Sequence, residues 1–195
     1  SRNYSVLKSL ITNTIDENVY LKSLEADETL AKCLYDNKRM IKNKLIQTKL
    51  IAHRNYEIRM SCAYDVEDDV LLMLLAKDTS DDVKERLCSN KKLTRQHVEV
   101  LVEKPTVDII SGLIRNNLKH LNPCVTQLLE QGKEDVRAYI ARSLKMRPSW
   151  EIKLREDTSA EVRKSLAENW NSNLSNETKE ILKEDADESV RAAVS

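Results

Sequence analysis

Residues 135–182 read DVRAYIARSLKMRPSWEIKLREDTSAEVRKSLAENWNSNLSNETKEIL and contain one pattern twice. In the second copy, Val162 is followed four positions later by Leu166, and the copy closes at Leu182. The first copy has the same arrangement, beginning at Val136. Because residues four apart share one face of a helix, each copy predicts an amphipathic helix followed by a shorter apolar segment.

The same pattern recurs along the whole chain at spacings of 24 to 28 residues. The apolar residues that open each copy are Val6, Leu30, Ile58, Val83, Ile109, Val136, Val162 and Val190. Those four positions later are Leu10, Leu34, Cys62, Leu87, Leu113, Ile140, Leu166 and Val194, and the closing leucines are Leu24, Leu50, Leu75, Leu101, Leu128, Leu154 and Leu182. A repeat of about 26 residues cannot enclose a core alone, so neighbouring repeats must stack. The sequence predicts an all-α solenoid of two-helix repeats over residues 1–195, with an incomplete last repeat.

A polar column follows the first helix of most repeats. It consists of Asn13, Asn37, Asn90, Asn116 and Asn169. Asparagine tolerates the left-handed backbone conformation, so we expect this column to end the first helix and turn the chain.

The motif of acidic turn, Val-Arg, apolar-Ala, Asn and closing Leu, present in Asp157 to Leu182 and clearest from about residue 78 onward, resembles the leucine-rich repeat variant family. More widely, the chain resembles the HEAT-like class of α-solenoids. The resemblance implies a right-handed superhelix in which an α-helix alternates with a shorter, often 3₁₀, helix. Some members of the family carry an iron–sulfur cluster on clustered cysteines. This chain has no matching cysteine cluster, so no cofactor is expected.

Composition limits the classes of partner. The chain contains no Phe and only two Gly, which favours helices, and its 32 basic residues balance 32 acidic ones. Its longest apolar run, residues 70–76, is too short to cross a bilayer, so we expect no membrane partner and a cytoplasmic protein. The cysteines, Cys33, Cys62, Cys88 and Cys124, are widely spaced, which favours reduced thiols over a metal site.

A basic column follows the openers and consists of Arg59, Lys84, Arg137, Arg163 and Arg191. It could bind phosphate or an acidic partner. The preferred interpretation is structural, because Asp78, Asp157 and Asp185 lie five residues before an opener and could pair with the column of a neighbouring repeat.

The largest charge imbalance is the basic segment, residues 38–59. Its cations are Lys38, Arg39, Lys42, Lys44, Lys49, Arg54 and Arg59. Residues 1–60 hold 11 basic and 7 acidic side chains. Several cations in reach of one phosphate backbone could bind nucleic acid, although solvated helix faces have the same composition.

Trp150 and Trp170 lie 20 residues apart, in or beside the turns between the helices of adjacent repeats. Exposed tryptophan is enriched at interface hot spots, so either could anchor a partner side chain. Packing against a neighbouring turn is the preferred interpretation.

Catalytic signals are weak. His53, His97 and His120 fall in different repeats, and no P-loop, GxSxG or HExxH motif is present. We therefore expect a non-enzymatic scaffold that binds another protein, as an adaptor, inhibitor or assembly factor. The alternative is a nucleic-acid-binding solenoid that uses the basic segment. A remote alternative is a helical-repeat DNA glycosylase.

Overall fold

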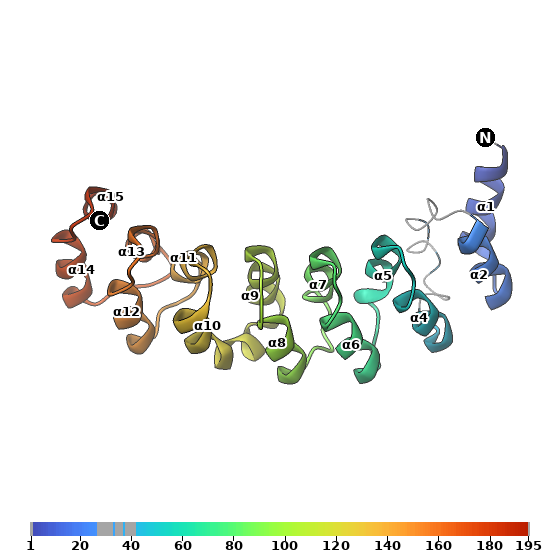
Figure 1. Ribbon diagram of the computed structural model, residues 1–195, viewed down its shortest axis with the longest axis horizontal. Coiled ribbons are helices and arrows are strands. Elements are labelled where there is room, and N and C mark those ends of the chain that lie inside the picture. Colours follow the sequence, from blue (N-terminus) through green and yellow to red (C-terminus); the bar gives the residue numbers. More distant parts are fainter. Residues whose placement is uncertain (1, 27–32, 34–36, 38–41, 195) are drawn as a thin grey trace. The chain divides into compact units, whose positions relative to one another are not determined.

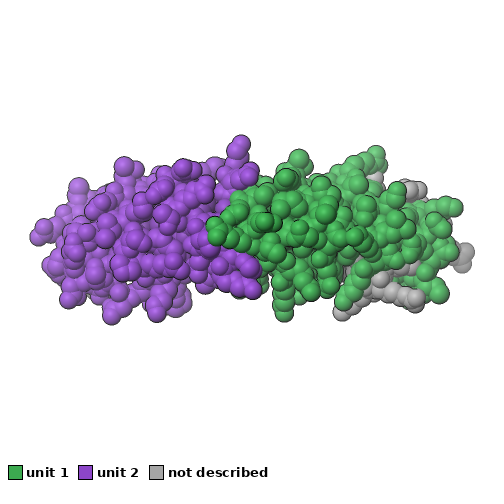
Figure 2. Space-filling model, turned by 90° about the horizontal axis from the view of Figure 1, so that it is seen from below, with its two compact units in different colours: residues 1–101, 115–117 green, residues 102–114, 118–195 purple. Residues whose placement is uncertain are grey.

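The computed structural model describes residues 2–26, 33, 37 and 42–194, and its regular structure is helical, with no strand in these ranges. Two compact units are present (Figure 2), one formed by residues 1–101 and 115–117 (unit 1) and the other by residues 102–114 and 118–195 (unit 2). The all-α class predicted from the sequence is confirmed.

The helices of unit 1 are α1 (Arg2–Asn13), α2 (Glu17–Ala26), α4 (Lys44–Ile51), α5 (Tyr56–Ala63), α6 (Asp69–Ala76), α7 (Asp81–Leu87) and α8 (Arg95–Leu101). Unit 2 contains a 3₁₀ helix at Asn122–Cys124, α10 (Val125–Gln131), α11 (Glu134–Ser143), α12 (Pro148–Arg155), α13 (Ala160–Ala167), α14 (Asn176–Lys183) and α15 (Glu188–Ala193). Helix α9 (Val107–Leu121) contributes residues to both units and is kinked at Asn117.

Inside each unit, a helix packs on the helix two places along the chain. In unit 1, α5 lies against α7, and α6 lies between α4 and α8 (Figure 1). In unit 2, α13 lies between α11 and α15, and α12 between α10 and α14. The helices therefore form two rows in each unit, one of first helices and one of second helices.

The core consists of the apolar columns predicted from the sequence. The openers Ile58, Val83, Ile109, Val136, Val162 and Val190 are fully buried, and the closing leucines Leu50, Leu75, Leu101, Leu128, Leu154 and Leu182 are at most 4% exposed. Burial of a leucine or valine side chain contributes about 1.5–3 kcal/mol. These columns are therefore the main source of stability in both units.

The first repeat departs from the expectation. Val6 is 56% exposed and Leu10 is 41% exposed, so neither belongs to the core. The buried residue of α1 is Ile11. The spacing rule was therefore wrong for this repeat, in which α1 packs on α2. Leu30 and Leu34 lie outside the described residues.

The asparagine column does not form left-handed turns, because no non-glycine residue of the described chain has a positive φ. Instead, its buried members donate hydrogen bonds to carbonyl groups of the preceding repeat. Asn90 Nδ2 lies 2.8 Å from the carbonyl oxygens of both Ala63 and Val66, and Asn169 Nδ2 lies 2.7 Å from that of Leu144.

The column also shifts by one residue in α9. Asn117, not Asn116, is buried and donates to the carbonyl of Cys88 at 2.7 Å. Asn117 has non-helical backbone angles (φ −135°), so its side chain leaves the helical register of the residues before it. Each buried asparagine satisfies carbonyl groups at the end of a first helix, which would otherwise be buried without partners.

Candidate binding surfaces

The basic column after the openers is engaged inside the protein. Arg163 donates from Nε and Nη2 to the two carboxylate oxygens of Asp185, at 2.6 and 2.8 Å. The pairs Arg137–Asp157 and Arg59–Asp78 have the same two-pronged geometry. The structural interpretation of these three arginines is confirmed, so they are not free to bind phosphate.

These arginines also hold the turn that precedes their own helix. Nη1 of Arg163 donates to the carbonyl of Asp157 at 2.7 Å, and Nη1 of Arg137 donates to that of Gly132 at 2.8 Å. Lys84 is an exception in the column, because it pairs with Asp81 at 2.5 Å on its own helix. A lysine has a single charged nitrogen and cannot form the planar, two-pronged contact.

The carboxylates of the three pairs are held in their charged form. Hydrogen bonds from the Arg163 guanidinium lower the pKa of Asp185 below its usual range. Burial opposes ionisation of Asp78 and Asp157, but the hydrogen bonds from Arg59 and Arg137 outweigh it, and both pKa values are lowered.

Part of the basic segment lies on the surface of unit 1. Lys42, Lys44, Lys49 and Arg54 are exposed. Lys38 and Arg39, the other predicted members of the site, lie outside the described residues. Arg59 is bound to Asp78, as described above.

Acidic side chains lie among these lysines. Lys44 forms an ion pair with Asp68 at 2.5 Å, although the Lys44 side chain remains 73% exposed. A hollow of about 410 Å³ contains both lysines Lys42 and Lys44, together with Gln47 and the acids Asp65, Glu67 and Asp68. The local potential is therefore mixed, which is unfavourable for a phosphate backbone.

The two tryptophans occupy different environments. Trp150 is 3% exposed, its indole Nε1 donates to Thr126 Oγ1 at 3.2 Å, and the guanidinium carbon of Arg147 lies 4.5 Å from the centre of its ring system. Trp150 is therefore a packing residue, and its candidate role as an exposed anchor was wrong. Trp170 lies in the turn between α13 and α14 and is 85% exposed, so it remains available to a partner.

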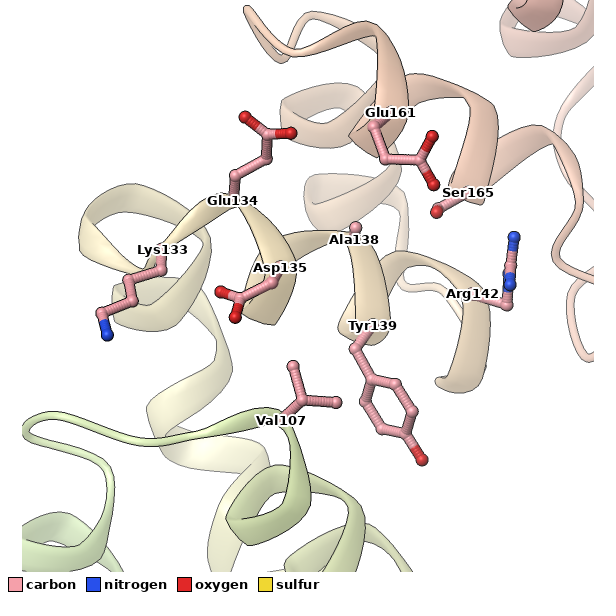
Figure 3. A pocket seen from close by; sticks show the side chains of 9 residues that line it. All are labelled: Val107, Lys133, Glu134, Asp135, Ala138, Tyr139, Arg142, Glu161 and Ser165. Carbon is pink, nitrogen blue, oxygen red and sulfur yellow. The ribbon is translucent and has the colours of Figure 1, made fainter.

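A groove that the sequence analysis missed crosses the first helices of unit 2 (Figure 3). Its volume is about 610 Å³. Its lining comes from the first residue of α9, from α11 and the residue before it, and from α13: Val107, Lys133, Glu134, Asp135, Ala138, Tyr139, Arg142, Glu161 and Ser165.

Acids predominate at one end of the groove, where the exposed cation Lys133 lies beside them. Glu134, Asp135 and Glu161 are exposed acids in the first turns of α11 and α13, where the helix dipole favours negative charge. Arg142 lies at the other end of α11 and forms an ion pair with Glu168. The Tyr139 hydroxyl donates to Ser111 Oγ at 2.9 Å, which fixes the ring at the groove wall.

A sequence signal for the groove existed but was weak. Acids precede several openers, as at Asp108, Asp135 and Glu161, and such acids also have a purely local explanation as helix-end charges. Only packing of α11 beside α13 brings residues 26 positions apart into one surface.

Neither metal binding nor thiol chemistry is supported by the side chains of the described residues. Throughout ranges 2–26, 33, 37 and 42–194, no group of three or more His, Cys, Asp or Glu side chains could hold a metal ion. All four cysteines are buried, and burial raises the pKa of the Cys62 and Cys88 thiols to about 12. Those two thiols are therefore protonated at neutral pH and poor nucleophiles.

In the same described part of the chain, no helix combines the length and apolar character needed to cross a membrane. Comparison of the chain with protein-family models, with curated proteins and with solved structures found no match.

Proposed function

We propose that this chain is a non-catalytic scaffold that binds another protein, built as a right-handed α-solenoid of short two-helix repeats. The two rows of helices within each unit support this architecture, as does the recurrence of the Arg–Asp and asparagine contacts at equivalent positions of the sequence repeat. Resemblance to leucine-rich repeat variant and HEAT-like proteins is consistent with it. In such arrays, binding uses extended surfaces made of equivalent helix positions.

The observation that carries the binding proposal is the groove of unit 2. Its walls come from successive first helices, so its shape depends on a stacked framework that the buried columns and the Arg137–Asp157 and Arg163–Asp185 pairs hold in place. A preformed surface on a rigid frame lowers the entropic cost of binding.

The chemistry of the groove favours a protein segment over nucleic acid. Glu134, Asp135 and Glu161 would repel a phosphate backbone, whereas Tyr139, Ala138 and Val107 offer apolar and aromatic contact. The competing proposal, nucleic-acid binding through the basic segment, uses Lys42, Lys49 and Arg54 on unit 1, so the two can be tested separately.

Site-specific photo-crosslinking tests the proposal. The photoreactive phenylalanine analogue p-benzoylphenylalanine would replace Tyr139 in the groove or, as a control, Ile152, which is 45% exposed on α12. The purified full chain would be irradiated in nuclease-treated lysate, and the adducts identified by mass spectrometry. We expect a defined protein adduct from position 139 that is missing from position 152.

The double variant Asp135→Lys and Glu161→Lys is expected to abolish that adduct without changing the thermal unfolding midpoint by more than a few degrees. Equal labelling from both positions, or an adduct unaffected by the charge reversal, would contradict the groove as the binding surface. Salt-sensitive retention of nucleic acid that depends on Lys42 and Lys49 would instead favour the competing proposal.

A further inference from the structure

Helix α6 is apolar on all sides yet only half buried. Its sequence is DVLLMLLA, and Leu71, Leu72, Leu75 and Ala76 form its buried face. On the opposite face, Val70 is 67% exposed and Leu74 is 53% exposed. A helix that is apolar all round is normally buried all round, so the outer face of α6 has the composition of an interface.

One residue of the neighbouring helix α4 adds to this apolar face. Leu45 is 56% exposed at the position equivalent to Val70, five residues before the closing leucine, whereas the position equivalent to Leu74 is Lys49. Corresponding outer positions of unit 2 differ. In unit 2, the residues that lie five positions and one position before a closing leucine are Pro123, Gln127, Ser149, Lys153, Glu177 and Ile181. Ile181 alone among these six is a large aliphatic residue, so exposed apolar side chains are not a general property of these two positions.

Opposite charges flank the apolar face of α6. Asp69, the first residue of the helix, has a side chain that is 73% exposed, although its carboxylate lies 3.4 Å from the buried His97 ring. Lys77 follows the last residue of the helix and is exposed. The two charges are eight residues apart, or about 12 Å along the helix. At 3.6 residues per turn, Asp69, Val70, Met73, Leu74 and Lys77 fall within an arc of about 140°.

Such a face is complementary to itself. When two identical helices pack antiparallel around a two-fold axis, Asp69 of each copy faces Lys77 of the other, and the apolar residues between them meet at the centre. A parallel arrangement would instead place like charges together. Isologous dimers require this kind of self-complementarity, in which residue i contacts residue j and j contacts i.

We propose that unit 1 forms a homodimer through α6, with the two copies of the helix packed antiparallel and Leu45 of α4 at the edge of the contact. This inference concerns unit 1 and is independent of the groove of unit 2. A dimer would present two copies of the groove and so strengthen binding to a partner with two sites.

Analytical ultracentrifugation of the full chain tests the proposal. We expect a reversible monomer–dimer equilibrium for the unmodified chain and an at least tenfold weaker dimer for Leu74→Glu, since like-charged groups at a desolvated contact are strongly unfavourable. Ile181→Glu is the matched control, because Ile181 occupies the equivalent position of α14 and is 41% exposed. This variant should dimerise as well as the unmodified chain.

Charge-reversal variants distinguish a specific contact from non-specific association. Asp69→Lys alone and Lys77→Glu alone should each weaken the dimer, because every pair then joins like charges. The double variant should dimerise again, and an equimolar mixture of the two single variants should form a heterodimer, because opposite charges then meet at both ends. Thermal unfolding of each variant checks that the monomer remains folded.

A chain that stays monomeric up to about 100 µM would overturn the proposal, since that concentration covers even weak association. A dimer that survives Leu74→Glu would overturn it as well, as would failure of the mixed single variants to associate. Loss of α6-dependent self-association combined with binding of a different protein at Leu74 would assign the face to a heterologous partner.

Discussion

The guanidinium of Arg163 and the carboxylate of Asp185 lie face to face, with Nε 2.6 Å from Oδ2 and Nη2 2.8 Å from Oδ1. Both side chains are largely buried, at 16% and 7% exposed. Arg163 lies on α13 and Asp185 in the turn before α15, so the pair ties one first helix to the next. The same contact at Arg137–Asp157 and Arg59–Asp78 makes this pair the most regular polar feature of the structure.

Removal of one partner of such a pair should be costly. Asp157→Ala leaves the Arg137 guanidinium, which is 17% exposed, without its carboxylate. We expect a loss of about 3 kcal/mol in the free energy of unfolding, because a buried charge loses its counter-charge and two hydrogen bonds. Urea denaturation of the full chain would measure it.

The matched control is Glu130→Ala, which breaks the exposed Lys153–Glu130 pair. Exposed pairs contribute little, so this variant should stay within about 0.5 kcal/mol of the unmodified chain. Equal effects of Asp157→Ala and Glu130→Ala would show that the buried Arg137–Asp157 pair does not stabilise the protein more than an exposed pair.

Acid should destabilise the protein through the same carboxylates. The pKa values of Asp78, Asp157 and Asp185 are lowered in the folded protein, so folding favours their charged form. Their contribution is complete above the ordinary aspartate pKa of about 3.9 and is lost as the pH falls through the lower folded-state values. The unfolding midpoint should therefore fall steeply below about pH 4.

Thermal unfolding followed by circular dichroism between pH 7 and pH 3 would test this dependence. Asp185→Asn should flatten the acid limb relative to the unmodified chain, because one group with a shifted pKa is removed. An unchanged acid limb in this variant would contradict the assignment.

Removal of a buried asparagine should also destabilise the protein, although no charge is lost. Asn169 is 4% exposed and donates to the carbonyls of Ala141 and Leu144, so Asn169→Ala removes two buried hydrogen bonds. We expect a loss of about 1–3 kcal/mol in the free energy of unfolding. Asn13→Ala provides the control from the same sequence column, since Asn13 is exposed and bonds locally to Ser9. Comparable losses in the two variants would contradict the buried role.

The closing leucines offer the most severe test of the core. Leu128 is 4% exposed, so Leu128→Asp buries an unpaired carboxylate and should destabilise the chain by more than about 4 kcal/mol. Gln127→Asp, at the neighbouring exposed position, should be close to neutral. Chemical denaturation of both variants would measure the difference, and a Leu128→Asp protein as stable as the parent would show that the repeat register is wrong.

Several of these features were predictable because they depend on spacing alone. The Arg–Asp pairs followed from aspartates five residues before an opener, and the buried columns followed from apolar residues that recur about every 26 positions. The role of the asparagine column was not predictable, because the side chain bonds to a carbonyl of the preceding repeat and not to its own turn.

The exposure of the two tryptophans was not predictable from spacing. Trp150 and Trp170 both lie close to the junction of two helices, yet one is 3% exposed and the other 85%. Trp150 lies within α12, which begins two residues earlier at Pro148, and so it points at the neighbouring α10 residue Thr126. Trp170 falls in the turn outside any helix.

By itself, the sequence determined the helical class, the buried columns and the polar pairs that join the first helices of successive repeats. Helical periodicity is a local property, and residues at i and i+4 share a face whatever lies around them. Tertiary structure alone decided the groove of unit 2, the burial of Trp150 and the exposed apolar face of α6. Each of these depends on which atoms of another helix lie opposite, and that is set by packing between segments about 26 residues apart.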